Sequence, residues 1–211
     1  MLTFTRPLLM GILNVTPDSF SDGGAYSSVS AACERALEMA AQGADIIDIG
    51  GESTRPGSRA VDDREQMDRV LPVIRELRGL LPAPVRLSID TRSAAVAEAA
   101  LAEGVAMLND VSAGLGDPRM IRLAADSGAC LVLMHMQGEP ATMQANPRYG
   151  NVVEEVRAFL LQRAAHAASC GVREDRLVID PGIGFGKRRD DNLQLLSGLP
   201  QFVDTGFPVL I

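Results

Sequence analysis

The stretch Asp45–Glu52, DIIDIGGE, holds a short apolar run that is followed at once by two glycines and a carboxylate. The run Asp45–Ile49 is rich in isoleucine and does not alternate cleanly, which is typical of a strand buried on both faces. Six similar runs lie along the chain, at Leu8–Leu13, Val85–Ile89, Ala106–Leu108, Cys130–Met134, Leu177–Ile179 and Val209–Ile211. The sequence therefore predicts seven short strands.

Helical patterns fill the segments between these runs. Asp62 and Glu65 have the spacing of a capping box, and Asp117 followed by Pro118 is typical of an N-cap and the first helical position. The predicted helices are Ser30–Ala41, Asp62–Leu80, Ser93–Ala102, Arg119–Asp126, Asn151–Ser169 and Asp191–Leu196. Strict alternation of strand and helix predicts an α/β protein with a parallel sheet. No Pro/Gly/Ser-rich linker interrupts the pattern, so we expect one domain over residues 1–211.

Polar residues follow six consecutive strands, namely Asn14, Gly50–Glu52, Asp90, Asn109–Asp110, His135 and Asp180. An open doubly wound sheet concentrates its ligand groups at one switch point, whereas a barrel gathers every strand end around one mouth. The pattern therefore favours a TIM (β/α)8-type barrel. Such a barrel needs eight strands and typically about 250 residues. About seven strands are found before Ile211, so the expected barrel domain is incomplete at its C-terminus.

Composition narrows the function classes. The 211 residues carry 20 Lys+Arg against 27 Asp+Glu, a net charge of −7, which argues against a nucleic-acid or anionic-membrane binder. No apolar run approaches a membrane span, and Met1–Pro7 lacks a signal-peptide core, so a cytoplasmic location is expected. Three widely spaced cysteines indicate buried thiols rather than disulfides or a zinc site.

Two loops, Asn14–Gly24 and Gly50–Gly57, are rich in glycine and hydroxyl side chains. Such loops suit close approach to phosphate oxygens, and their Asn and Asp residues suit a hard cation such as Mg²⁺. Together with Ser88–Arg92, Leu108–Ala113 and Ile179–Lys187, the segments Leu13–Gly24 and Gly43–Pro56 resemble the sequence blocks of dihydropteroate synthases, in that family's order and spacing. The resemblance covers nearly the whole chain.

The resemblance implies a pterin-binding barrel that condenses 6-hydroxymethyl-7,8-dihydropterin diphosphate with p-aminobenzoate, giving 7,8-dihydropteroate and pyrophosphate. It implies three catalytic residues, Asn14 as a Mg²⁺ ligand, Arg55 and Asp90. It further implies that Thr54 contacts the pterin diphosphate and that Asp90, Asn109 and Asp180 bind the pterin. A carboxylate such as Asp180 is a natural partner for the guanidine-like edge of that ring. Met134 is a candidate to pack on the pterin, and Phe185 and Pro56 to flank the p-aminobenzoate ring, although each also fits a core or turn role.

The implied mechanism is electrostatic, so no Ser-His-Asp or Cys-His arrangement is needed. We expect His135 to line a pocket wall. Lys187, the only lysine, either ends the Gly-rich block Ile179–Lys187 or is an ordinary surface residue. The family also suggests a homodimer.

The chain departs from the family in lacking a lysine-bearing loop after a seventh strand and an Arg-x-His segment on an eighth. Either the protein continues beyond Ile211, or the polypeptide is truncated, in which case weak turnover and low stability are expected. Two other functions stay open. One is a pterin-dependent methyltransferase, which does not need the diphosphate and metal loops. The other is a catalytically inactive homologue that binds a pterin.

Overall fold

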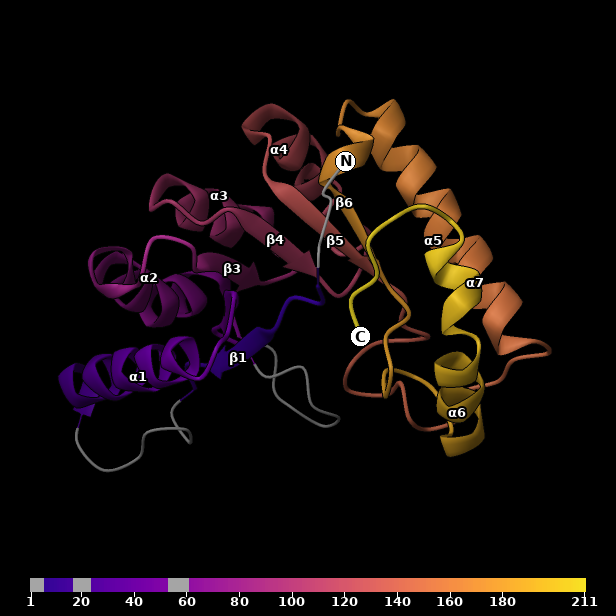
Figure 1. The fold of residues 1–211 in the computed structure, drawn as a ribbon, viewed down its shortest axis with the longest axis horizontal. Coiled ribbons are helices and arrows are strands. Elements are labelled where there is room, and N and C mark those ends of the chain that lie inside the picture. The colour runs from indigo at the N-terminus through magenta and orange to yellow at the C-terminus, as the bar shows by residue number, and fades with distance from the viewer. Residues whose placement is uncertain (1–5, 17–23, 53–60) are drawn as a thin grey trace. The chain divides into compact units, whose positions relative to one another are not determined.

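The computed structural model describes residues 6–16, 24–52 and 61–211, with the backbone alone for residues 24–28. These residues form two compact units, which we call the N-terminal unit (up to Asn109) and the C-terminal unit (Asp110–Ile211). Each unit alternates strands with helices (Figure 1).

The N-terminal unit contains β1 (Met10–Asn14), α1 (Gly24–Ala41), β2 (Ile46–Gly50), α2 (Asp63–Leu80), β3 (Arg86–Asp90), α3 (Ala94–Ala102) and most of β4 (Met107–Asp110). The strands pair in chain order and all are parallel. Helices α1 and α2 pack against β2 and against each other, and α3 follows alongside α2 (Figure 1). Ile47, Ile49 and Ile89 are fully buried beneath these helices.

The C-terminal unit contains α4 (Arg119–Ser127), β5 (Cys130–Met134), α5 (Val152–Ser169), a 3-10 turn η2 (Glu174–Arg176), β6 (Leu177–Asp180), α6 (Arg189–Ser197) and α7 (Leu199–Val203). Strands β5 and β6 are parallel, and their register pairs Met134 with Asp180. Helix α5 packs on both strands and on α6 (Figure 1). Ile179, Leu160 and Phe202 lie in one buried cluster that joins β6 to α5 and α7.

The predicted strands are confirmed within one or two residues, except the seventh. Val209 forms an isolated parallel bridge with Ile179, and Ile179 donates its N–H to the Pro208 carbonyl. The expected strand Val209–Ile211 is therefore present as one bridge and not as an extended strand. The expectation that every strand is buried on both faces is wrong for β1, since Ile12 is 68% exposed.

One of the two predicted helix caps is confirmed. Asp62 accepts a hydrogen bond from the Glu65 N–H at 2.8 Å. The N-cap of α4 is Pro118 rather than Asp117, although Asp117 still accepts the Arg119 N–H. Among the thiols, Cys33 and Cys130 are buried as expected, but Cys170 is exposed because it ends α5 at the surface.

Candidate active site

One row of residues crosses the N-terminal unit at the carboxyl ends of its strands. The register pairs Asn14 with Gly50, Gly50 with Asp90, and Asp90 with Asn109. Residues paired in this way present their side chains on one face of the sheet. The structure therefore brings three of the sequence-predicted residues together, and we call Asn14, Gly50, Asp90 and Asn109 the polar row.

Gly50 leaves a space within this row. A Cβ atom placed on Gly50 would lie 3.4 Å from Asn14 Oδ1 and 3.5 Å from Asp90 Oδ2, in contact with both oxygens. The two oxygens thus approach the same point above the glycine. Hard oxygen atoms grouped in this way suit a divalent cation of the Mg²⁺ type.

Asp48 is a site residue that the sequence reasoning missed. It lies in the middle of β2, is 3% exposed, and accepts a hydrogen bond from Asn109 Nδ2 at 2.8 Å. Burial raises the pKa of the Asp48 carboxyl, while Ser88 and Asn109 act to lower it. A charged residue inside an otherwise apolar strand, two positions before Gly50 and hence on the same face, is the signal that could have identified it.

Asp180 ends β6 in the C-terminal unit. Its Oδ1 atom accepts the Gly182 N–H at 2.6 Å. Burial raises the pKa of Asp180 to about 6, although the Gly182 hydrogen bond and the positive charge of Lys187 oppose the rise. A desolvated carboxylate with open acceptor capacity is suited to a ligand that carries N–H donors.

Lys187 is buried, so the surface alternative for this residue is wrong. Its ammonium group lies 3.1 Å from His135 Nδ1, 3.0 Å from the His135 carbonyl and 2.9 Å from the Phe185 carbonyl. Lys187 therefore ties the loop that follows β6 to the end of β5. Burial lowers the pKa of Lys187 to about 7, against the opposing charges of Asp180 and Asp191.

His135 contributes the other half of this contact. Its ring packs edge-on against Phe159 with 4.9 Å between ring centroids, and burial together with the Lys187 charge lowers its pKa to about 3. A neutral imidazole packed against an aromatic ring, with Nδ1 beside Lys187, is held in place by its surroundings. It fits the expected wall role and not that of a nucleophile.

The lowered pKa of Lys187 predicts a pH dependence of stability. The Lys187 amine has a pKa of 10.5 in the unfolded chain and of about 7 in the folded protein. Between these two pH values the unfolded state binds more protons, so the free energy of unfolding rises with pH. Between pH 7 and 9 the expected rise from this group is about 2 kcal/mol. Chemical denaturation of Lys187→Met should lack this rise. The exposed control Arg189→Met should keep it, and equal slopes for all three proteins would contradict the assignment.

Of the remaining predicted residues, the structure describes Met134 and Phe185. Met134 is buried at the end of β5, and Phe185 is half-buried in the loop after β6. Met134 pairs with Asp180 in the register, so the two residues adjoin. Thr54, Arg55 and Pro56 lie outside the described residues.

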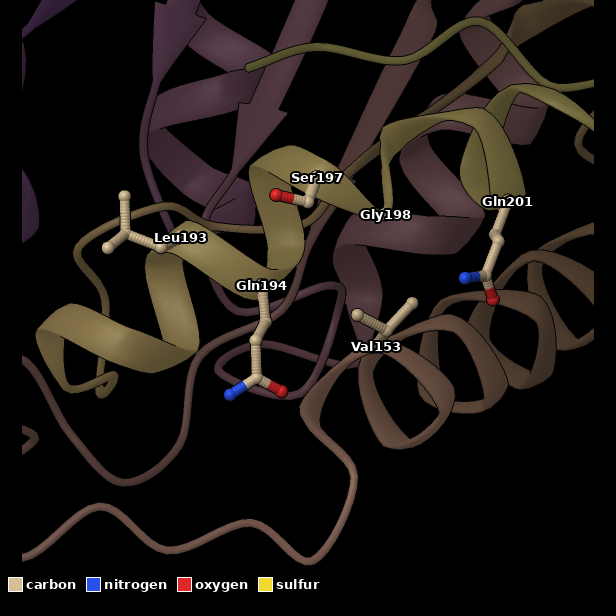
Figure 2. Close-up of a pocket in the computed structure, with 6 residues that line it drawn as sticks. All are labelled: Val153, Leu193, Gln194, Ser197, Gly198 and Gln201. Atoms are coloured by element: carbon tan, nitrogen blue, oxygen red, sulfur yellow. The ribbon is translucent and has the colours of Figure 1, made fainter.

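A shallow hollow lies where α5, α6 and α7 meet (Figure 2). It is lined by Val153, Leu193, Gln194, Ser197, Gly198 and Gln201. The lining has no charged side chain, and it contains none of the predicted site residues. We assign it no ligand.

The chain belongs to the family of pterin-binding enzymes, because the family model described as "Pterin binding enzyme" matches residues 10–211. Its relatives in that family include dihydropteroate synthases. It is 44% identical to the enzyme of Synechocystis sp. over 98% of this chain and 71% of the relative. It is 46% identical to that of Mycobacterium leprae over 96% of this chain and 71% of the relative.

Solved structures agree with this assignment. Xanthomonas albilineans dihydropteroate synthase with 4-aminobenzoic acid matches with a TM-score of 0.89 and 48% identity, over 97% of this chain and 72% of that one. The same enzyme in complex with 7,8-dihydropteroate matches with a TM-score of 0.85 and 44% identity, over 99% and 72%. These are TIM-barrel enzymes, so the expected fold class is confirmed.

Proposed function

We propose that this chain is a dihydropteroate synthase, a transferase of folate biosynthesis. It joins 6-hydroxymethyl-7,8-dihydropterin diphosphate to p-aminobenzoate and releases pyrophosphate. The observation that carries this proposal is the family match over residues 10–211, at 44–48% identity to synthases that include one solved with 4-aminobenzoic acid. The relatives named here are synthases, which favours this function over a pterin-dependent methyltransferase.

Pterin recognition is the role that we propose for Asp90, Asn109 and Asp180. Dihydropterin presents N–H donors beside acceptor atoms, so it needs both carboxylates and a group that can donate and accept. Asn109 is such a group, and its amide is already engaged by Asp48. Asp180 supplies a charged acceptor for the donor edge. Met134, next to Asp180 in the register, supplies an apolar surface for the ring.

Asn14 is the residue that we propose to hold Mg²⁺. The described residues contain no group of three or more His, Cys, Asp or Glu side chains placed to hold a metal. Mg²⁺ often uses only one or two protein ligands, with waters and substrate phosphates completing its shell. The space over Gly50 is flanked by two such oxygen atoms, Asn14 Oδ1 and Asp90 Oδ2, and is consistent with this coordination. When bound, the ion would neutralise charge on the departing pyrophosphate.

Gly50→Ala tests this space directly. The new methyl group would occupy the point between the Asn14 and Asp90 oxygens without a severe clash. We expect turnover to fall about tenfold or more, and the Mg²⁺ concentration for half-maximal rate to rise, because a charge-stabilising contact is displaced. Gly79→Ala, in α2 with no atom near the new Cβ, is the matched control and should keep full activity. Unchanged Mg²⁺ dependence in Gly50→Ala would refute the proposed metal position.

The chemistry requires positioning more than acid–base catalysis. The C–O bond at the exocyclic methylene breaks, the p-aminobenzoate nitrogen forms a C–N bond there, and that nitrogen loses a proton. An aromatic amine is unprotonated at neutral pH, so no strong base is needed. We propose that Thr54 and Arg55 bind the diphosphate, that Arg55 also pairs with the p-aminobenzoate carboxylate, and that Phe185 and Pro56 flank its ring.

Product formation is the test of this function. The protein is incubated with the pterin diphosphate, p-aminobenzoate and MgCl₂, and dihydropteroate is measured by mass spectrometry together with released pyrophosphate. We expect stoichiometric formation of both products. Pterin binding without either product would instead identify an inactive homologue.

A homodimer is also proposed, by analogy with the family, and analytical ultracentrifugation would test it. No helix among the described residues is long and apolar enough to cross a membrane. The cytoplasmic location stays a prediction from the sequence.

A further inference from the structure

Asp48 is a buried carboxylate for which the proposed mechanism has no direct use. It lies between Ile47 and Ile49, both fully buried, and is itself 3% exposed. A charge in such surroundings is costly unless it is hydrogen-bonded. Within the described residues, Asp48 accepts one side-chain hydrogen bond in good geometry. Its donor is Asn109 Nδ2, on β4 two strands away.

The level of Asp48 in the sheet places it beneath the polar row. Asp48 pairs with Ser88 in the register, two residues before the pair Gly50 and Asp90. Because side chains alternate with a period of two, Asp48 and Ser88 lie on the same face as the polar row, one layer further from the strand ends. The contact from Asp48 to Asn109 therefore joins the lower layer to the upper one.

This layer also contains unused hydrogen-bonding capacity. Asp48 Oδ1 and Ser88 Oγ are both buried and have no partner in hydrogen-bond geometry within the described residues. Burial raises the pKa of Asp48, and the nearby Ser88 hydroxyl acts in the opposite direction by favouring the charged carboxylate. Within the part of the chain that the structure describes, Asp48 therefore depends on Asn109 for its one well-formed side-chain hydrogen bond.

The contact fixes which way the Asn109 amide faces. A carboxylate accepts hydrogen bonds, so the Nδ2 side of Asn109 must face Asp48, and the reverse orientation would set two oxygens against each other. Asn109 then keeps its Oδ1 atom and one N–H for another group. Without Asp48, both orientations of the amide would be populated, and in the reverse orientation Asn109 would set its N–H group against a donor of the ligand.

We propose that Asp48 is a positioning residue that holds the Asn109 amide in the orientation that reads the pterin ring. The inference rests on the proposed function, since it takes the pterin as the ligand of Asn109. It assigns Asp48 no contact with substrate. Its effect passes through Asn109 alone, which separates it from a general contribution to folding.

Asp48→Asn is the informative substitution, because it keeps the size of the side chain and removes the charge that selects one amide orientation. Titration calorimetry with the pterin diphosphate and Mg²⁺ should give an affinity about tenfold to a hundredfold weaker, as for a mispaired buried hydrogen bond. The KM for p-aminobenzoate should stay unchanged. The control Asp126→Asn, an exposed carboxylate on α4, should bind like the wild type.

A double-mutant cycle decides whether the effect passes through Asn109. Asn109→Ala should weaken pterin binding, and Asp48→Asn added to it should weaken binding no further. Multiplying effects, or wild-type affinity in Asp48→Asn, would overturn the inference while leaving the function in place. Failure of the wild-type protein to bind the pterin would count against the proposed function and, with it, against this role.

A second pair of variants does not depend on ligand. Asn109→Asp places two carboxylates together in a buried site and should lower the Tm, and adding Asp48→Asn should restore it by re-forming one carboxylate–amide pair. Restoration supports the contact even if Asp48→Asn alone folds poorly. No restoration would overturn it.

Discussion

Gly182→Ala should abolish pterin binding and destabilise the protein by about 4 kcal/mol or more, one of the largest effects expected of a single methyl group. Gly182 has a φ of +67°, and a Cβ there would come within 3.0 Å of the backbone carbonyl oxygen of His135. Backbone cannot yield as a flexible side chain can. The loop after β6 would have to move, taking with it the N–H that Asp180 accepts.

Gly184→Ala is the matched control for this prediction. Gly184 also has a positive φ, of +88°, but a Cβ there would meet no atom within 4 Å. It carries only the backbone penalty for a left-handed alanine, about 1–2 kcal/mol. Urea denaturation and pterin titration of both variants would check the difference. Equal destabilisation would mean that the close approach to His135 does not constrain the loop.

Asp180→Asn should separate binding from stability. The carboxylate's charge-assisted hydrogen bonds to the pterin are lost, so we expect pterin affinity to fall about a hundredfold or more at pH 7.5. The loop should stay in place, because an asparagine oxygen can still accept the Gly182 N–H. Titration calorimetry would measure the loss, with Asp126→Asn as the exposed control.

The same substitution should stabilise the fold. The pKa of Asp180 is raised from 3.8 to about 6, so its contribution to stability is present below pH 3.8 and is lost as the pH rises through 6. At pH 7.5 the buried charge therefore costs up to about 3 kcal/mol, which asparagine would recover. Wild-type pterin affinity should correspondingly fall below pH 6 as Asp180 takes up a proton. A less stable Asp180→Asn variant that binds normally would contradict both statements.

Sequence periodicity was sufficient for most of the fold. Apolar runs located β1 to β6 because parallel strands are short and largely apolar, and Asp62 marked the start of α2 because its side chain satisfies an N–H group that a helix leaves free. Helix α7 was missed. Its five residues, Leu199–Val203, are too short for a periodic signal and include a proline.

The site was predictable where a residue directly follows a strand. Asn14, Asp90 and Asn109 lie at or next to the carboxyl ends of β1, β3 and β4, so the parallel register alone brings them into one row with Gly50 of β2. Asp48 was overlooked because it lies within an apolar run and its partner is 61 residues away. Lys187 can be buried because its ammonium group donates hydrogen bonds to two carbonyl groups, those of His135 and Phe185. These two residues are far apart in the sequence, so no local pattern predicts the contact.

The burial of Lys187 also has a practical use, because this is the only lysine among 211 residues. Within residues 1–211 an amine-directed acylating reagent finds no exposed lysine side chain, so modification at Lys187 requires the loop after β6 to open. The rate at which mass spectrometry detects acyl-Lys187 would therefore report opening of this one loop, and no engineered residue is needed.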